Sequence, residues 1–352
     1  MRVALDATPL TAPPGGIRRY TAELSAALAR EFPDDEFLLA SDQGFRAPVG
    51  PANLKRLPGP RGRAGRRWWS LGLPAALVRG RISVFHGTDF AVPYLRVKPA
   101  VMTLHDLSPW RAGPDRDASR RVRRRTPWLL RLGLADLVIT PTEAVAREAV
   151  VRFGVEPDRI RVVPEAAAAV FYPEPEPPAR RFVLSIGAPI ARKNLGVLVE
   201  AWRAARRRHE VDLVLAGPRQ GASGPVPEPG LVIAGEVSDG ELRRLYSTAA
   251  VFAYPSTYEG FGLPVLEAMQ CGAPVVASRI PAIQEVAGEA ALLVEPGDAG
   301  AWAEALSAML ENPERRQALV QASLERAAQF DWARTARETM AVYREAIGRF
   351  GR

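Results

Sequence analysis

The chain of 352 residues is 47% apolar and has a formal net charge of +8, which suits a globular protein of two domains. It has no apolar run of about 18 residues, so no membrane-spanning helix is expected, and its first residues, MRVALDATPL, lack the regions of a signal peptide. Cys271 is the only cysteine, which excludes an intrachain disulfide and a cysteine zinc cluster and fits a reducing compartment.

The positive charge is concentrated in the first half of the chain. Residues 1–172 contain 27 Lys and Arg against 17 Asp and Glu, whereas residues 173–352 contain 20 against 22. Most of the excess lies in residues 44–131, with 19 basic and 4 acidic side chains. This asymmetry indicates an anionic partner, for which a membrane surface, a lipid phosphate, an anionic glycan and nucleic acid are candidates.

Short apolar runs alternate with amphipathic helical runs along the chain. The apolar runs are nearly continuous, which favours parallel strands covered on both faces. Strands are expected in RVALDA, EFLLA, ISVFHG, AVMTLHD, DLVITPT and IRVVPE of the first half, and in RFVLSIG, VDLVLAG, LVIAG, VFAYPS, PVVAS and AALLVEP of the second. Helices are expected at residues 20–30, 194–207, 239–248 and 299–310. The pattern predicts two doubly wound α/β units.

The sequence FYPEPEPPARR at residues 171–181 marks a boundary, because alternating proline and glutamate form a stiff, exposed linker. We therefore expect one Rossmann-like domain at residues 1–172 and a second at 173–335. Residues 336–352 belong to a terminal amphipathic helix that we expect to cross back to the first domain. Two such domains would leave an interdomain cleft at the carboxyl ends of their strands, where ligands bind.

Two histidines end predicted strands of the first half. His105 follows the strand in MTLHD, and His86 ends the strand in VFHGTDF, where it could face an acceptor. Ligands meet parallel sheets at this end of the strands, but a lone histidine there is more often a structural residue. Both interpretations stay open on these residues alone.

The stretch LSIGAPIARKNLG contains Lys193, one of only three lysines in the chain. The predicted strand ends at Gly187, a loop follows, and Asn194 is suited to cap the next helix. Arg192 and Lys193 then lie beside a helix N-terminus, an arrangement that favours an anion, above all phosphate. A solvated basic turn is the alternative.

The stretch YPSTYEGFGLPVLEAMQCGAPVVAS places a glycine loop between a strand and a helix. Gly262 allows a close backbone approach to a ligand, and Pro264 suits the first turn of the helix. The N–H groups of Phe261, Gly262 and Leu263 can therefore face a polar ligand.

Two carboxylates flank the same loop. Glu259 precedes the helix and Glu267 lies inside it, so that both can face the cleft and reach different parts of one ligand. The alternatives are a surface acid for Glu259 and compensation of the helix dipole for Glu267.

Four motifs together resemble glycosyltransferase family 4, the retaining group with the GT-B fold. EGFGLPVLEAMQCGAPVVAS is similar to its signature of two glutamates separated by seven residues, and GAPIARKNL to its donor-phosphate loop. VMTLHDLSPW contains its His-Asp pair at His105 and Asp106, and PPGGIRRYTAEL resembles its N-terminal glycine loop. The similarity extends from Arg2 to about Tyr343 and implies two Rossmann-like domains.

The resemblance implies a role for each residue. The donor would be a nucleotide diphosphate sugar, used as a co-substrate without a further cofactor. The implied contacts are the diphosphate with Arg192 and Lys193 behind Gly187, the ribose with Glu267, and the sugar with Glu259, His105 and the backbone of Phe261, Gly262 and Leu263. Gly15 and Gly16 would let the opposite loop approach the phosphates.

The resemblance further implies a retaining hexosyltransferase that needs no metal. GDP or UDP is the expected nucleotide, mannose the expected sugar, and a glycan or lipid-linked acceptor of polysaccharide biosynthesis the expected acceptor. An epimerase or phosphorylase of similar architecture and a catalytically silent nucleotide-sugar-binding subunit are the alternatives.

The remaining charged segments bear on partners and location. Asp115 and Asp117 resemble a metal-binding acid pair but lie in a basic loop, so no metal site is expected. Residues 61–80 and 116–133 combine arginines with tryptophans, which suits an anionic membrane surface, although solvated helices explain them equally well. No nucleic-acid-binding module accompanies the charge. We expect a cytoplasmic protein, with a peripheral position on the inner face of the cell membrane as a further expectation.

Two departures from the family pattern concern the first domain. AAAAV follows Glu165 where the family commonly has a glycine-containing turn, so this interdomain loop is expected to differ. Arg18 and Arg19 follow the glycine loop and favour an anionic acceptor.

Overall fold

The computed structural model describes residues 1–59, 67–111, 120–174, 180–218 and 225–351. The chain divides into two compact units, which are treated separately below. Unit 1 consists of Met1–Glu165 and Asp331–Arg352, and unit 2 of Ala166–Phe330. No helix of the described residues is both long and apolar enough to cross a bilayer.

Unit 1 is built on a parallel sheet of seven strands in the order β3-β2-β1-β4-β5-β6-β7. Its first strand is central, and the strand order reverses between β1 and β4, which is the point where doubly wound sheets bind ligands. The strands are β1 (Arg2–Asp6), β2 (Glu36–Ala40), β3 (Leu54–Arg56), β4 (Val84–Gly87), β5 (Ala100–Thr103), β6 (Leu137–Thr140) and β7 (Ile160–Val162).

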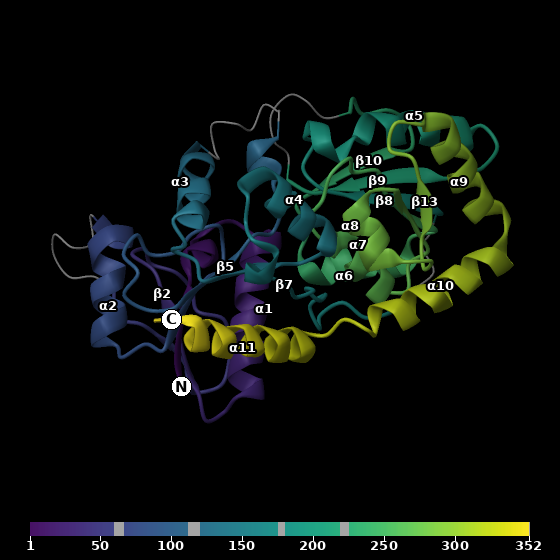
Figure 1. The fold of residues 1–352 in the computed structure, drawn as a ribbon. Coiled ribbons are helices and arrows are strands. Elements are labelled where there is room, and N and C mark those ends of the chain that lie inside the picture. The colour runs from purple at the N-terminus through teal and green to yellow at the C-terminus, as the bar shows by residue number, and fades with distance from the viewer. Residues whose placement is uncertain (60–66, 112–119, 175–179, 219–224, 352) are drawn as a thin grey trace. The chain divides into compact units, whose positions relative to one another are not determined.

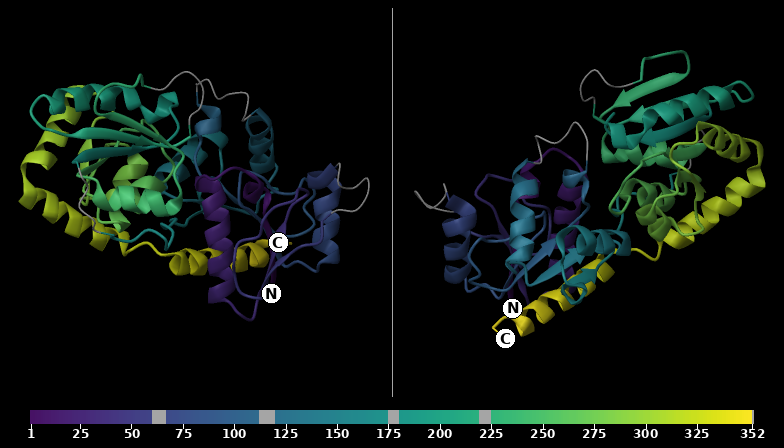
Figure 2. Two further views of the ribbon diagram at one scale, coloured as in Figure 1. Left: turned by 180° about the vertical axis from the view of Figure 1, so that it is seen from behind. Right: turned by 45° about the horizontal axis from the view of Figure 1, so that its top comes forward.

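Helices cover both faces of this sheet (Figure 1). Buried side chains of α2, α3 and α4 pack on one face, and α1 packs with the terminal helix α11 on the other. Figure 2 shows α11, in yellow, alongside the purple α1 in unit 1. The helices are α1 (Gly16–Glu31), α2 (Leu73–Arg79), α3 (Arg120–Arg131), α4 (Glu143–Phe153) and α11 (Trp332–Arg349).

A buried polar network holds α11 on the sheet. Nδ1 of His86 lies 2.7 Å from the Tyr343 hydroxyl, and Nε2 lies 2.7 Å from the hydroxyl of Thr103. Burial, with a smaller contribution from His105, lowers the pKa of His86 to about 3, so the ring is neutral. Of the two interpretations left open for His86, the structure supports the structural one, because the side chain is fully buried and its nitrogens contact Tyr343 of α11 and Thr103 of β5.

Unit 2 repeats the arrangement with six parallel strands in the order β10-β9-β8-β11-β12-β13. The strands are β8 (Phe182–Ile186), β9 (Asp212–Ala216), β10 (Leu231–Gly235), β11 (Val251–Tyr254), β12 (Val275–Ser278) and β13 (Leu292–Val294). The helices are α5 (Leu195–Arg206), α6 (Asp239–Thr248), α7 (Leu263–Gln270), α8 (Pro281–Ala287), α9 (Ala299–Glu311) and α10 (Pro313–Ala327).

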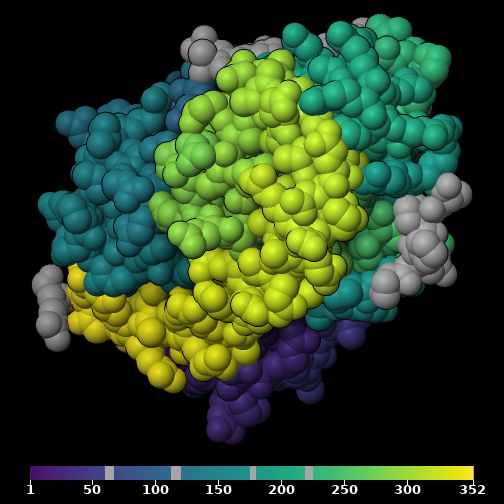
Figure 3. Space-filling model, turned by 90° about the vertical axis from the view of Figure 1, so that its right-hand side faces the viewer, coloured from purple at the N-terminus to yellow at the C-terminus, as the bar shows by residue number. Residues whose placement is uncertain are grey.

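The two faces of this second sheet have separate cores. Buried residues of α5 and α9 pack on one face, and those of α6, α7 and α8 on the other (Figure 1). The predicted fold of two doubly wound parallel sheets is confirmed. The sequence analysis did not predict β3 or α10. The helix α10 packs on α7, and it lies with α9 on the yellow-green outer surface of unit 2 in Figure 3. Part of the predicted linker, residues 175–179, lies outside the described residues.

Candidate active site

The loop after β8 turns sharply to bring two cations to the carboxyl edge of the sheet in unit 2. Gly187 ends the strand with φ of 137°, and a Cβ there would lie 3.2 Å from the side chain of Lys193. The short helix Ala191–Lys193 follows, and Asn194 turns the chain into α5 with φ of 53°. Glycine at 187 therefore gives Lys193 the room to cross the end of the strand.

Asn194 does not cap α5 through its side chain, contrary to the expectation from the sequence. Its amide nitrogen donates instead to the carbonyl oxygens of Pro255, at 3.2 Å, and Pro296, at 2.6 Å. The left-handed backbone turns the side chain away from the helix amides, and its two hydrogen bonds tie the loop after β8 to those after β11 and β13.

Four side chains converge on one oxygen of Glu259. Oε1 accepts hydrogen bonds from Lys193 Nζ at 2.6 Å, Arg192 at 3.0 Å, the Tyr254 hydroxyl at 2.9 Å and the Ser256 hydroxyl at 2.6 Å. Lys193 also donates to the Tyr254 hydroxyl and lies 4.7 Å from the centre of that ring. These five residues, Arg192, Lys193, Tyr254, Ser256 and Glu259, are called the Glu259 cluster below.

The Glu259 cluster is buried and charged. The Glu259 and Lys193 side chains are each 11% exposed, and that of Arg192 is 33% exposed. Burial alone would raise the pKa of Glu259, but Lys193, Arg192 and the Ser256 hydrogen bond outweigh it and lower the pKa to about 2. The cluster is thus a site where two cations already hold an oxyanion at the carboxyl edge of a parallel sheet.

The loop before α7 shows why glycine is needed at position 262. Its φ is 99°, and a Cβ there would lie 2.3 Å from Cδ1 of Ile283. Pro264 occupies the first turn of α7, as predicted. Because α7 begins at Leu263, the N–H groups of Phe261, Gly262 and Leu263 lie at or before the helix start, where an α-helix offers no internal acceptor.

Glu267 lies inside α7 and is also buried. Its Oε2 accepts a hydrogen bond from the Tyr246 hydroxyl at 3.1 Å, and burial together with this carboxylate raises the pKa of Tyr246 well above its usual value. Glu259 and Glu267 both raise the pKa of Tyr254, after burial, which indicates that this phenol lies near both acids. Tyr246 and Tyr254 were not singled out from the sequence.

In unit 1, His105 is buried between two acceptors. Nε2 lies 2.8 Å from the Thr88 carbonyl oxygen, which can only accept, and Nδ1 lies 3.0 Å from Glu165 Oε1. Burial opposes the charge, but the Glu165 carboxylate outweighs it and raises the pKa of His105. A doubly protonated ring satisfies both contacts, and the raised pKa favours that form. Thr88, His105 and Glu165 are called the His105 cluster below.

Two further acids lie at this edge. Burial raises the pKa of Asp6, at the end of β1, to about 7, although hydrogen bonds from Thr8 oppose it. Asp89 follows β4, and its Oδ1 is buried without a hydrogen-bond partner in the described part of the chain. The sequence analysis missed Asp6, Asp89 and Glu165. Their signal was available, because Asp6 and Glu165 lie at the carboxyl ends of the predicted strand segments RVALDA and IRVVPE, and Asp89 follows ISVFHG by two residues.

Gly15 and Gly16 begin α1 in unit 1. Gly15 is extended, with φ of 173°, and a Cβ there would come no closer than 3.9 Å to Pro13. The local backbone therefore does not require glycine at position 15. No group of three or more His, Cys, Asp or Glu suited to a metal occurs among the described residues, and Asp115 and Asp117 lie outside them.

Comparison with known proteins identifies the family of the chain. Residues 180–312 match the family model described as glycosyl transferases group 1, and residues 14–167 match that of glycosyltransferase family 4. O-antigen chain mannosyltransferase B of Escherichia coli is 31% identical over 283 residues, which cover 74% of each chain. The chain belongs to glycosyltransferase family 4. It is therefore a glycosyltransferase that depends on a nucleotide diphosphate sugar.

Solved structures show that this family 4 enzyme has the GT-B fold. Sucrose-phosphate synthase from Thermosynechococcus elongatus superposes with a TM-score of 0.76 at 23% identity, over 99% of both chains. Anabaena HepE, in complex with UDP and glucose, superposes with a TM-score of 0.70 at 20% identity, over 97% of this chain and 98% of HepE. The Glu259 and His105 clusters lie at the carboxyl edges of the two sheets of this family 4 chain.

Proposed function

We propose that unit 2 is the donor-binding domain of a retaining hexosyltransferase. Arg192 and Lys193 hold the diphosphate, Glu267 binds the ribose hydroxyls, and Glu259 binds the sugar together with the backbone of residues 261–263. The Glu259 cluster supports this assignment, because its cations already bind a carboxylate oxyanion and a phosphate oxygen has the same requirement.

The proposed chemistry uses these residues to stabilise the leaving group. A nucleoside diphosphate gains negative charge as the glycosidic bond breaks, and two fixed cations and the first amides of α7 oppose that charge without a metal. In its protonated form, which Glu165 favours, His105 provides a positive charge in unit 1, the proposed acceptor-binding domain. Gly15 and Gly16 give the phosphates room beside the start of α1. The departing phosphate assists attack on the same face of the sugar, which retains its configuration.

The proposed donor is GDP-mannose, and the proposed acceptor is a glycan or a lipid-linked saccharide on the cytoplasmic side of a membrane. The similarity to O-antigen chain mannosyltransferase B of Escherichia coli favours mannose as the transferred sugar. HepE binds UDP and glucose, so UDP-sugars are the alternative donors to be tested with equal weight.

The observation that carries the proposal is the convergence of Lys193 and Arg192 on Glu259. The direct test is calorimetric titration with GDP, UDP and their sugars, with and without EDTA. Micromolar binding of one nucleotide series that EDTA leaves unchanged is expected. Binding of none would overturn the donor site. Binding without nucleotide release toward any acceptor would favour the silent subunit, and isomerised donor would favour an epimerase.

The Glu259→Gln variant distinguishes the proposed contact with the sugar from the proposed contacts with the diphosphate. The amide can no longer neutralise the cations, so the free nucleoside diphosphate is expected to bind as tightly as in wild type or more tightly. Turnover of the nucleotide sugar is expected to fall about 100-fold, because a contact to the sugar is lost. Glu314→Gln, at an exposed position of unit 2, is the matched control. Equal turnover in both variants would remove Glu259 from the sugar site.

A further inference from the structure

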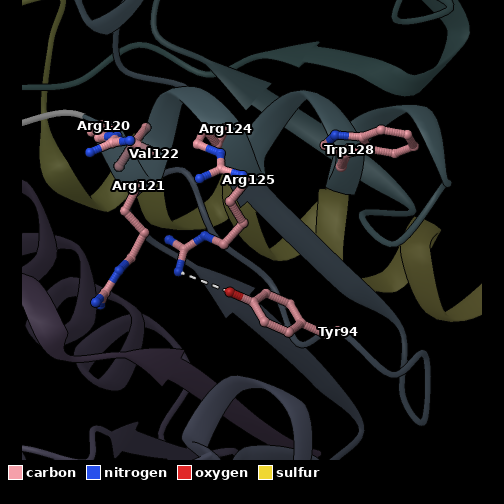
Figure 4. A pocket seen from close by; sticks show the side chains of 7 residues that line it. All are labelled: Tyr94, Arg120, Arg121, Val122, Arg124, Arg125 and Trp128. Carbon is pink, nitrogen blue, oxygen red and sulfur yellow. Dashed lines mark hydrogen bonds between the residues drawn. The ribbon is translucent and has the colours of Figure 1, made fainter. Parts of the chain in front are cut away.

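A pocket in unit 1 is lined by arginines that the proposed donor chemistry does not use. It has a volume of about 880 Å³ and lies between α3 and the segment after β4. Figure 4 shows the side chains around it. Its polar and aromatic lining comes from Tyr94, Arg120, Arg121, Arg124, Arg125 and Trp128. This group is called the α3 pocket below.

The spacing of these residues places them on one face of α3. Arg120 and Arg124 are four residues apart, as are Arg121 and Arg125, and Trp128 follows Arg124 by another four. Like charges at this spacing destabilise a helix by about 0.2–0.5 kcal/mol per pair. Within the described part of the chain, Arg120, Arg121 and Arg124 form no ion pair or side-chain hydrogen bond. The structure therefore contains like-charge repulsion that a bound anion would relieve.

Arg125 connects the pocket to the carboxyl edge of the sheet. Its guanidinium donates to the Tyr94 hydroxyl at 3.5 Å and lies 5.1 Å from the ring centre of Trp69. Its Nε is buried and has no hydrogen-bond partner among the described residues. The same guanidinium acts on the buried carboxyls of Asp6 and Asp89, whose pKa values it lowers against the larger effect of burial. A buried donor without a partner is costly and points to a missing acceptor.

We propose that the α3 pocket binds the phosphate or diphosphate group of the glycosyl acceptor. A planar guanidinium donates two parallel hydrogen bonds to phosphate oxygens, so a set of four on one helix face suits an ester that bears more than one charge. Trp128 and Tyr94, 63% and 39% exposed, offer aromatic faces to the sugar or chain that the phosphate carries. The pocket thereby selects acceptors by charge.

This inference rests on the proposed function, because an acceptor exists only if the chain transfers a sugar. The proposed donor diphosphate has its own cations, Arg192 and Lys193, in unit 2. The acceptor phosphate can belong to a soluble sugar phosphate or to a lipid-linked saccharide, since both present the same group. Mechanistically, Arg121 and Arg124 are positioning residues for the acceptor and take no part in bond breaking.

The test uses the full chain saturated with its preferred nucleoside diphosphate, so that the donor site is occupied. Inorganic pyrophosphate is then titrated into wild type, Arg121→Ala/Arg124→Ala and Arg121→Lys/Arg124→Lys. The alanine variant is expected to bind at least about tenfold more weakly, with the lysine variant between, because lysine keeps the charge without the planar fork. Arg207→Ala/Arg315→Ala removes the same charge from exposed positions of unit 2 and is expected to match wild type.

Kinetics supply the second readout. With a phosphorylated acceptor, Arg121→Ala/Arg124→Ala is expected to raise the acceptor KM about tenfold and leave the donor KM and the slow hydrolysis of donor by water unchanged. Soluble sugar phosphates and polyprenyl diphosphate saccharides in detergent are compared as acceptors, and the one whose KM depends on the arginines identifies the source. A variant that merely folds poorly would lose donor hydrolysis as well.

Three outcomes would each overturn a different claim: the α3 pocket as an anion site, the acceptor as its ligand, or the proposed function. If pyrophosphate binds equally to wild type and the alanine variant while nucleotide binding is intact, the α3 pocket assignment fails alone. If only binding to phosphatidylglycerol-containing vesicles is lost, relative to phosphatidylcholine vesicles, the arginines meet a membrane and the acceptor assignment fails. If wild type binds no nucleotide, the proposed function fails and the acceptor assignment falls with it.

Discussion

The first six strands of unit 1 follow the same order as the six strands of unit 2, yet the carboxyl edges of the two sheets differ in charge. In unit 2, two permanently charged side chains, Lys193 and Arg192, converge on one carboxylate oxygen. In unit 1, one titratable ring, His105, is held by one carboxylate, Glu165, with Asp6 and Asp89 beside it. The first edge is suited to an anion at any physiological pH, because lysine and arginine stay charged.

This difference in charge between the two edges determines which groups of a ligand each unit can bind. Both nitrogens of His105 already have acceptors, so the ring offers charge and position rather than a free hydrogen-bonding atom. Burial raises the pKa values of the nearby Asp6 and Asp89, so these carboxyls hold a proton more readily than exposed acids do. Carboxyl groups at this edge favour hydroxyl groups as ligands, because a hydroxyl both donates and accepts hydrogen bonds. Our proposal assigns anion recognition in unit 1 to the arginines of α3, of which Arg125 also acts on the two buried acids at this edge.

The largest expected effect tests the unit 2 side of this comparison. Lys193→Ala removes a buried ammonium that the proposed diphosphate needs, so nucleoside diphosphate affinity is expected to fall about 100-fold and kcat/KM on the order of 1,000-fold. Calorimetry and initial rates measure the two effects. Lys55→Ala, which removes an exposed lysine paired with Glu36 in unit 1, is the control. Equal nucleotide affinity in Lys193→Ala and wild type would remove the phosphate site.

The next largest expected effect tests the role of His105 at the carboxyl edge of unit 1. His105→Ala removes a ring whose positive charge the Glu165 carboxylate favours, and it leaves the proposed donor cations in place. We expect kcat to fall about 100-fold, while the affinity for the nucleoside diphosphate changes less than about threefold. The measurement is a comparison of kcat with calorimetric affinity. A larger loss of binding than of kcat would make His105 a ground-state ligand and end the proposed division between the two edges.

The Glu165→Gln variant tests the charge of His105 a second time, through the pH dependence of kcat. Glu165 raises the pKa of His105, so its removal is expected to shift the alkaline limb of the kcat profile to lower pH. Glu156→Gln, at an exposed position of unit 1, is the control and is expected to leave the limb in place. An unchanged limb in Glu165→Gln would show that the charge of His105 does not limit turnover.

Much of this architecture was predictable from periodicity. The twelve predicted strands were found because buried parallel strands are nearly continuous apolar runs. The strand β3 was missed because its sequence, Leu-Lys-Arg, is short and polar at the edge of a sheet. The helix α10 was missed because only Ser323 and Ala327 of its residues are buried, so its apolar stripe is narrow.

The site was only partly predictable, for reasons visible in particular residues. Strand-end position pointed to both histidines, but it does not tell which face a side chain takes, and His86 points at α11. Lys193 and Glu259 were both named, yet their contact joins residues 66 apart and depends on the turn at Gly187. Asn194 has the residue type of a helix cap but a left-handed backbone set by its tertiary contacts.

The final expected effect concerns the dependence of stability on pH, which should have opposite signs at the two edges. The folded pKa of Glu259 is about 2, below its ordinary value of 4.5, so its contribution to stability is present above pH 4.5 and is lost as the pH falls toward 2. The loss is on the order of 3 kcal/mol at 1.36 kcal/mol per pKa unit. The folded pKa of His105 is raised, so its contribution is present below pH 6.5 and is lost as the pH rises through the folded pKa.

Thermal unfolding of the full chain between pH 2.5 and 9, in wild type, Glu259→Gln and Glu165→Gln, measures both limbs. Glu259→Gln is expected to flatten the acid limb and leave the alkaline limb intact, although its overall stability is lower because Lys193 and the partly exposed Arg192 lose their carboxylate. Glu165→Gln is expected to flatten the alkaline limb. If each variant instead changed both limbs equally, the two edges would titrate as one coupled system and could not be treated as separate sites.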